Sequence, residues 1–245
     1  MSDEQPTEIV LTGGRMATRV VWTGDTVRKP STDTSPFVAE LLNLLETKGF
    51  QGAPRYVGQA EGSDIFTFID GRVPARFQAW SDSQVQAAAR LLRQMHDATS
   101  GSTLAGHSEV VCHHDPGPNN YVFQCKVPIA LIDFAEAAPG SRLEDVAYLA
   151  WTWSISSALR LPLERQAQQV RLIADAYSLQ EAERLALIDS VMDRQLRNVR
   201  FWARFLAHPA TAPAAPQVLN DRIAWSHREH AFTLLHREVF DTVLR

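Results

Sequence analysis

Three polar side chains within one short stretch, Asp115, Asn120 and Asp133, have the types and the spacing of a divalent-cation site. Asp115 and Asn120 lie in a loop, and two short apolar runs follow at residues 121–123 and 129–132, separated by a polar turn. Runs of this length around a turn predict a β-hairpin, which would bring Asp133 back towards Asn120. Carboxylate and amide oxygens that leave room for water and phosphate suit Mg²⁺. The pattern therefore predicts that Asn120 and Asp133 hold Mg²⁺, while Asp115 meets a hydroxyl group.

The same residues also resemble a known pair of loops. His113-His114-Asp115 with Asn120, followed by Ile132-Asp133-Phe134, is similar to the catalytic loop and the metal loop of the protein-kinase-like superfamily. Within it, the segment most resembles the aminoglycoside phosphotransferase and choline kinase branch. This resemblance implies that Asp115 is catalytic and accepts the hydroxyl proton or aligns the nucleophile. It also implies that His113 fixes the loop, and that Asn120 and Asp133 bind the metal.

Residues 139–148 resemble the next stretch of that family, which implies that Asp145 holds the catalytic loop by its backbone. His114 and Pro116 depart from the family pattern, which commonly has glycine between the histidine and the aspartate. Without the resemblance, residues 115–120 are also explained as a tight turn, because Asp, Asn, Pro and Gly favour turns for local reasons. The order and the intervals of the whole set favour the kinase-like interpretation. A zinc site at residues 112–115 is disfavoured, because adjacent residues cannot all converge on one tetrahedral ion.

The first third of the chain reads as short strands around turns, followed by a helix from residue 37 to residue 48. In a kinase-like small lobe the turn at Gly13 and Gly14 would lie over the nucleotide phosphates, since glycine allows close backbone approach. Arg28, rather than its neighbour Lys29, is predicted to be the cation on those phosphates. Glu40, early in the helix, is the candidate acid that pairs with that cation. A plain hairpin and solvated charges remain the alternatives for all of these positions.

A further strand at residues 65–69 ends at a Gly- and Pro-containing break, where we expect the boundary between two lobes. The resemblance implies that the backbone of Phe68 and Ile69 belongs to the hinge that binds adenine. The predicted fold is α+β and two-lobed, with a β-sheet lobe at residues 1–70 that carries one helix. Residues 71–245 would form a larger, mostly helical lobe that contains the catalytic and acceptor-binding groups. Its predicted helices include residues 163–177, 180–206 and 218–240.

Composition sets broad limits on function. The chain has 245 residues, 45% hydrophobic and 21% charged, as in an ordinary globular protein. A net charge of −4 disfavours nucleic acid as a partner. The sequence shows no long apolar run and no signal-peptide pattern at residues 1–8, so we expect a cytoplasmic protein that is not membrane-bound. The two cysteines, Cys112 and Cys125, are expected to be free thiols.

Taken together, these residues predict a small-molecule kinase that transfers the γ-phosphate of ATP or GTP, with Mg²⁺, to a hydroxyl group. The absence of a long activation segment after Asp133 favours a small-molecule acceptor over a protein. The alternative is a non-catalytic kinase-like module that binds a nucleotide or a partner. Aminoglycoside, macrolide, amino alcohol and sugar kinases share these motifs, so the sequence names no acceptor. It also leaves both a monomer and a homodimer open.

Overall fold

The computed structural model describes residues 9–11 and 20–245. The described part of the chain begins with an antiparallel sheet of strand order β1-β2-β3-β5-β4. Its strands are β1 (Ile9–Leu11), β2 (Val20–Thr23), β3 (Thr26–Pro30), β4 (Tyr56–Ala60) and β5 (Ser63–Thr67). The tight turn between β2 and β3 falls at Gly24, which has a φ of +55°. Glycine suits that left-handed conformation because it lacks a Cβ.

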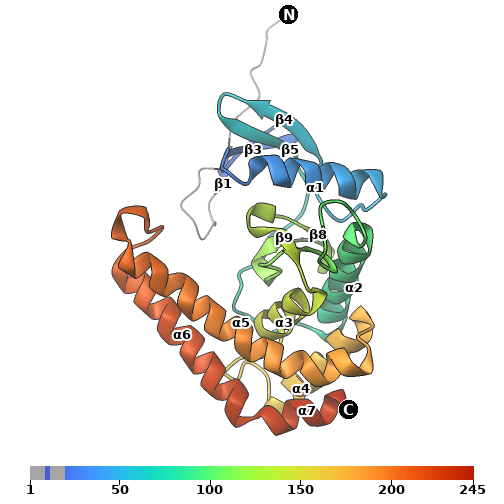
Figure 1. The fold of residues 1–245 in the computed structure, drawn as a ribbon, viewed down its shortest axis with the longest axis vertical. Helices are drawn as coiled ribbons and strands as arrows, with labels where there is room; N and C mark the ends of the chain where they lie inside the picture. Colours follow the sequence, from blue (N-terminus) through green and yellow to red (C-terminus); the bar gives the residue numbers. More distant parts are fainter. Residues whose placement is uncertain (1–8, 12–19) are drawn as a thin grey trace, which may run out of the picture.

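Helix α1 (Ser35–Thr47) lies between this sheet and the rest of the molecule (Figure 1). Proline at the second helical residue fits the first turn, where no backbone N–H is needed. The buried side chains Val38, Leu41, Leu42 and Leu45 recur at helical spacing, so one face of α1 joins the core. Gly49, in the left-handed conformation, follows the helix end.

The remaining residues form a larger and mostly helical part. Two small two-stranded sheets pair β6 (Val110–Cys112) with β9 (Ala138–Gly140) and β7 (Tyr121–Gln124) with β8 (Val127–Leu131). The helices are α2 (Asp82–Thr99), α3 (Arg142–Trp153), α4 (Leu163–Tyr177), α5 (Glu181–Ala207), α6 (Pro216–Leu235) and α7 (Arg237–Leu244). Three 3₁₀ turns complete the fold: η1 (Pro118–Asn120), η2 (Phe134–Glu136) and η3 (Pro209–Thr211).

The predicted α+β architecture, a β-rich N-terminal part followed by a larger helical part, is confirmed. The exact boundary at residue 70 stays a prediction. The helix expected over residues 218–240 is wrong as a single element, because the chain breaks at His236 and continues as α7. This break turns Phe240 and Leu244 into the core, where both are almost fully buried. Burial of two large apolar side chains outweighs the cost of interrupting one helix.

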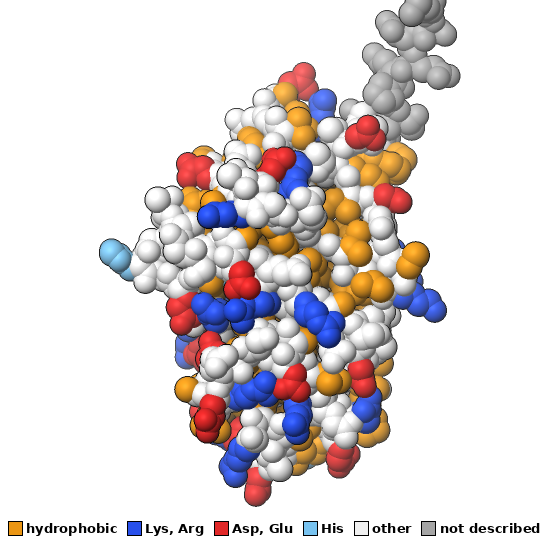
Figure 2. Space-filling model, turned by 90° about the vertical axis from the view of Figure 1, so that its right-hand side faces the viewer, with side chains coloured by type: hydrophobic (Ala, Val, Ile, Leu, Met, Phe, Trp, Pro, Cys, Tyr) orange, Lys and Arg blue, Asp and Glu red, His pale blue; other side chains and the backbone are white. Residues whose placement is uncertain are grey.

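Helices α5 and α6 run side by side as a long arm that extends away from the other helices (Figure 1). On the face shown in Figure 2, acidic and basic side chains are interspersed over the helical part. None of the helices in the described ranges is both long enough and apolar enough to cross a membrane.

Candidate active site

The predicted hairpin is present and brings Asn120 next to the segment that carries Asp133. Strands β7 and β8 pair with Tyr121 opposite Leu131. One step further along, the N–H of Ile132 donates to the carbonyl oxygen of Asn120 at 2.9 Å. Asp133 is the next residue. The two proposed metal ligands therefore lie at the same end of one hairpin, as the pattern of apolar runs predicts.

Asn120 also orients the carboxylate of Asp115. Its Nδ2 donates to the Asp115 backbone carbonyl at 2.8 Å and to Oδ2 of the Asp115 carboxylate at 2.9 Å. Asn120 is buried, and its own Oδ1 accepts from Nδ2 of Asn119 at 3.0 Å. The side chains of Asp115 and Asn120 thus form one hydrogen-bonded unit, joined through the hairpin to Asp133.

Asp145, at the start of α3, holds the loop from behind. Its fully buried carboxylate accepts hydrogen bonds from the backbone N–H of His113 at 2.6 Å and of His114 at 2.8 Å. Nε2 of the buried His96 is 3.0 Å from the same carboxylate, and Nδ1 of His96 is 2.6 Å from the hydroxyl of Tyr177. The backbone contact implied by the family resemblance is therefore present. His96 and Tyr177 are additional members that the sequence did not reveal.

The charge of Asp145 is maintained by these partners. Burial raises the pKa of Asp145, but the hydrogen bond from His96 and the nearby histidine charges outweigh it and lower the pKa to about 2. The carboxylate is consequently ionised at neutral pH. An ionised acceptor makes stronger hydrogen bonds to backbone N–H groups than a neutral one.

His113 links the loop to the hairpin. Its buried ring places Nε2 at 3.0 Å from the carbonyl oxygen of Ile132, and its Nδ1 accepts from the N–H of Asp115 at 3.3 Å. Both ring nitrogens are thereby used in holding the backbone on either side of the site. His113 is therefore a positioning residue in this geometry and not a group that meets substrate.

Two non-glycine residues of the site adopt left-handed backbone conformations, His114 with φ +62° and Asp133 with φ +66°. This conformation costs roughly 1–2 kcal/mol for a residue with a Cβ. The left-handed conformation at His114 also explains why the family pattern commonly has glycine at that position. At His114 the surroundings enforce it: its N–H is bound by Asp145, and its carbonyl accepts from Nη2 of Arg194 at 2.7 Å. Strain held in place by several contacts is typical of functional loops.

Lys29, the neighbour of the predicted nucleotide cation Arg28, is the basic residue of β3 that reaches the Asp133 loop. Nζ of Lys29, and not Arg28, contacts Oδ1 of Asp133. Successive strand residues point to opposite faces of a sheet, so in β3 only one of the two can face the catalytic loop. Lys29 is opposite Asp64 in the strand register, whereas Arg28 is opposite Ile65. Arg28 forms no ion pair with any described residue.

The predicted partner of that cation, Glu40, is also corrected. Glu40 is exposed on α1, on the side away from the buried Leu41 and Leu45, and it makes no ion pair within the described ranges. The carboxylate on the same sheet face as Lys29 is Asp64, which is 5% exposed. It accepts hydrogen bonds from the hydroxyl of Ser35, at the start of α1, and from Ser31 at 3.2 Å.

The proposed hinge is partly occupied by the protein itself. The N–H of Phe68 donates to the carbonyl of Asp25 at 2.8 Å, and its ring stacks on Trp22 with centroids 4.5 Å apart. The Phe68 N–H is therefore already bound within the protein, so its carbonyl is the backbone group that stays a prediction for adenine binding. The half-buried Ile69 stays a predicted hinge residue. Gly13 and Gly14 lie outside the described residues.

The donor set at the end of the hairpin fits Mg²⁺. Oδ1 of Asn120 and the carboxylate of Asp133 are hard oxygen ligands, and two protein ligands leave room for water and phosphate. The Asp133 side chain is 44% exposed, and its contact with Lys29 uses Oδ1. A second cluster, His96, Cys112 and Asp145, has potential ligand atoms within 4.8 Å of one another. Asp145 already accepts three hydrogen bonds there, and burial raises the pKa of the Cys112 thiol, so this cluster is a structural one.

Replacing Lys29 and Arg28 of β3 by methionine, one at a time, distinguishes the roles of the two cations. We expect Lys29→Met to raise the KM for ATP and lower kcat/KM by roughly 10²-fold, because a charge-assisted contact with phosphate contributes about 1.5–3 kcal/mol. Arg28→Met, one position away on the other face, is the matched control and should change kcat/KM less than about threefold. Steady-state kinetics with ATP as the varied substrate measures both. Equal losses in the two variants would contradict the assignment to Lys29.

The antiparallel sheet, helix α1, the loop that carries Asp115 and the β7–β8 hairpin together have the arrangement of the protein-kinase-like fold class. Residues 101–188 match the model of the phosphotransferase enzyme family. The chain is 29% identical to the trifolitoxin immunity protein of Rhizobium leguminosarum bv. trifolii, over 97% of this chain and 98% of that protein. The family resemblance stated from the motifs is thus confirmed.

Solved structures agree on the fold. A choline/ethanolamine kinase family protein from Mesorhizobium loti has a TM-score of 0.67 at 14% identity, covering 100% of this chain and 94% of the other. A spectinomycin phosphotransferase in complex with ADP and spectinomycin has a TM-score of 0.65 at 11% identity, covering 92% of each chain. Together with the family match, this similarity supports a phosphotransferase that acts on a small molecule.

Proposed function

We propose that the protein transfers the γ-phosphate of ATP to a hydroxyl group of a small molecule in a Mg²⁺-dependent reaction. One observation carries the proposal: Lys29 of the N-terminal sheet contacts Asp133, which lies at the same end of the hairpin as Asn120, and Asn120 in turn binds Asp115. Three separate segments thereby supply the proposed phosphate-binding cation, the two proposed metal ligands and the carboxylate that would meet the hydroxyl group. The match of residues 101–188 to a phosphotransferase family supports this proposal.

Each group has a distinct task in that reaction. Asn120 and Asp133 would hold Mg²⁺, which neutralises charge on the phosphate oxygens. Lys29 would leave Asp133 for a phosphate oxygen when the nucleotide binds. Asp115, oriented by Asn120, would accept the hydroxyl proton or align the hydroxyl oxygen. In a loose phosphoryl-transfer transition state, positioning contributes more than base strength.

The test is release of ADP from ATP over a panel of hydroxyl-bearing small molecules, with product phosphorylation followed by mass spectrometry. We expect turnover that requires both an acceptor and Mg²⁺ and that stops when EDTA is added. The same panel with GTP measures the preference for the donor. Nucleotide release that is indifferent to every acceptor, or transfer that persists in EDTA, would contradict the proposal.

A second candidate function is suggested by the curated relative, which is an immunity protein and matches almost the whole chain. We propose as the alternative that this chain confers immunity by binding, as a kinase-like module without catalysis. Expression of wild type and of Asp115→Asn in trifolitoxin-sensitive cells separates the two. Protection by wild type alone indicates phosphate transfer, whereas equal protection by both indicates binding.

A further inference from the structure

Arg76, in the segment between β5 and α2, is a buried cation without a carboxylate. Its side chain is 8% exposed, and only Nη2 has a polar partner, the Tyr148 hydroxyl at 2.7 Å. Nε and Nη1 are buried and have no hydrogen-bond partner, and no described residue forms an ion pair with Arg76. An uncompensated buried charge costs several kcal/mol. Such a group is expected to have a counter-charge in the working protein.

Aromatic rings surround this guanidinium group. Its Cζ lies 5.5 Å from the ring centroid of Tyr148, 5.4 Å from that of Trp225 and 5.7 Å from that of Phe77. Cation–π contacts offset part of the cost of burial and hold the group in one place. They leave the two unpaired nitrogens, Nε and Nη1, without an acceptor.

A second arginine approaches the same tyrosine from α5. Cζ of Arg194 is 4.9 Å from the ring centroid of Tyr148, and its Nη2 donates to the carbonyl of His114 at 2.7 Å. Its Nε is also buried without a hydrogen-bond partner. Two guanidinium groups over one ring repel each other. Glu229, a buried acid on the helix that carries Trp225, accepts hydrogen bonds from Ser157 and forms no ion pair with either arginine among the described residues.

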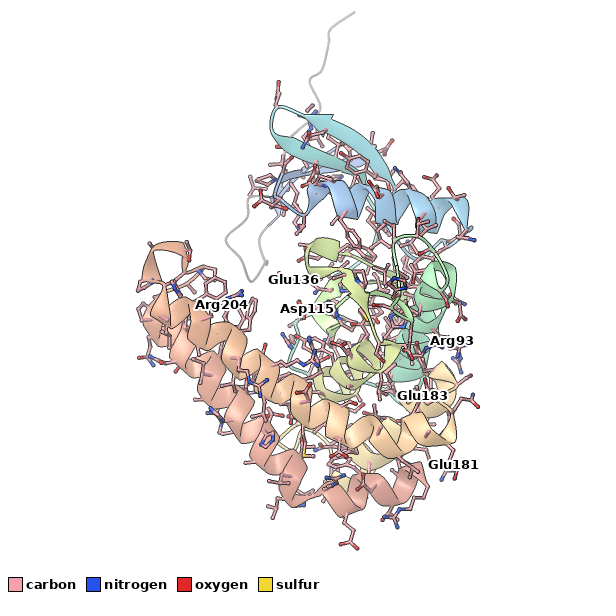
Figure 3. The ribbon with its side chains drawn as sticks, viewed as in Figure 1. Arg93, Asp115, Glu136, Glu181, Glu183 and Arg204 are labelled. Atoms are coloured by element: carbon pink, nitrogen blue, oxygen red, sulfur yellow. The ribbon has the colours of Figure 1, made fainter. Side chains whose placement is uncertain are left out.

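Both arginines contact Tyr148, and the ring of Tyr148 lies beside the proposed catalytic carboxylate. A Cβ placed on Gly117 would lie 3.7 Å from Cε1 of Tyr148 and 3.8 Å from Oδ1 of Asp115. The tyrosine ring and the carboxylate therefore flank one methyl-sized position. In Figure 3, Asp115 lies in the part of the loop that faces α5, the helix that carries Arg194. Both arginines thus lie on the side of Asp115 where Tyr148 lies, whereas Lys29 approaches Asp133 from the N-terminal sheet.

We propose that Arg76 and Arg194 bind an anionic group, a carboxylate or a phosphate, on the molecule whose hydroxyl meets Asp115. The inference rests on the proposed function and names the acceptor class: a hydroxylated acid. Planar guanidinium N–H groups pair with two oxygens of such an anion. A polycationic acceptor would be repelled at this position, since like charges brought together at a binding site disfavour the partner.

Pairs of hydroxylated compounds that differ by an acidic group test whether the site prefers an anion. Glycerate is compared with glycerol, serine with ethanolamine, and glycerol 3-phosphate with glycerol, by thermal shift in the presence of a non-hydrolysable ATP analogue and Mg²⁺. The same probes are then assayed for ADP release. We expect the acidic member of each pair to bind more tightly, with glycerate and glycerol 3-phosphate separating a carboxylate preference from a phosphate preference. Equal or tighter binding of glycerol and ethanolamine would overturn the proposal.

Variants of Arg76 and Arg194 test whether these two side chains bind the acidic group. In Arg76→Met and Arg194→Met we expect the affinity for the acidic probe to fall roughly 10- to 100-fold, the loss typical of a charged hydrogen bond. Where turnover is measurable, KM for the acid should rise while kcat changes little. The melting temperature of Arg76→Met without probe should not fall, because methionine removes an unpaired buried charge and fills a similar volume. Arg76→Lys keeps the charge without the planar fork and should recover only part of the affinity.

Arg93→Met is the matched control. Arg93 lies over Tyr177 at the same 5.5 Å but is paired with Asp97, on the side of α2 away from Asp115 (Figure 3). It should bind the acidic probes as wild type does. Unchanged probe affinity in both arginine variants would overturn the proposal. Acid binding that is lost in them, without ADP release from any probe, would support the anion site and reject the proposed transfer reaction.

Discussion

Asp115→Asn is expected to lower kcat for phosphate transfer by about 10²- to 10⁴-fold, the usual range for loss of a proton acceptor. The amide is nearly isosteric with the carboxylate, and its oxygen can still accept from Nδ2 of Asn120, which now binds Oδ2 of Asp115. The loop geometry should therefore survive, and the change should fall on kcat more than on the KM for ATP. ADP-release kinetics and a thermal melt of the same preparation measure the two effects.

Glu181→Gln provides a control, because this exposed acid begins α5 far from Asp115 (Figure 3). It should leave kcat within about twofold. A fully active Asp115→Asn enzyme would remove the proposed role of the carboxylate. Inactivity accompanied by a large fall in melting temperature would instead show that Asp115 is needed for the loop to form.

Asp145→Ala is expected to lower the free energy of unfolding by about 3–5 kcal/mol, the cost of removing one partner from a buried charged network. It would leave the N–H groups of His113 and His114 and Nε2 of His96 without their acceptor. Since most domains have only about 5–15 kcal/mol of stability, this change approaches the limit for folding. Urea unfolding measures it, with Asp145→Asn as a milder variant that retains one oxygen acceptor.

The exposed Asp97, which forms an ion pair with Arg93, is the control, and Asp97→Ala should change stability by less than about 1 kcal/mol. An unfolding midpoint of Asp145→Ala equal to that of wild type would contradict the bracing role.

The pH dependence of Asp145 has a definite sign. Its pKa in the folded protein, about 2, is lower than the ordinary value of 3.8. The folded state therefore favours the ionised form. Its contribution to stability is fully present above about pH 4 and is lost as the pH falls through about 2. Wild-type stability should decline more steeply than that of Asp145→Asn between these values, which acid unfolding at several pH values would show.

Local sequence patterns were sufficient to predict the hairpin of β7 and β8. The apolar runs around residues 125–127 define strands and their register, and the register alone brings Asp133 to Asn120. Helix α4 was predicted for the same reason, since its buried positions recur at helical spacing. These elements are determined by interactions between residues that are close in sequence.

Features that depend on packing between distant segments could not be predicted in this way. The choice between Arg28 and Lys29 depends on which face of β3 is turned to the catalytic loop, and neighbouring residues of one strand look alike in sequence. The exposure of Glu40 depends on how α1 rotates when its leucines enter the core. The contacts of Arg76 and Arg194 with Tyr148 join three segments separated by up to 118 positions.

Lys29 lies beside Asp133, the proposed metal ligand, and its ammonium group contacts that carboxylate. In the proposed reaction, binding of metal and nucleotide would therefore be an exchange of cations. Divalent metal alone would compete with the ammonium group, whereas a nucleotide offers that group a new anionic partner and vacates the carboxylate. Metal and nucleotide should consequently strengthen each other's binding by the same factor, as thermodynamic linkage requires.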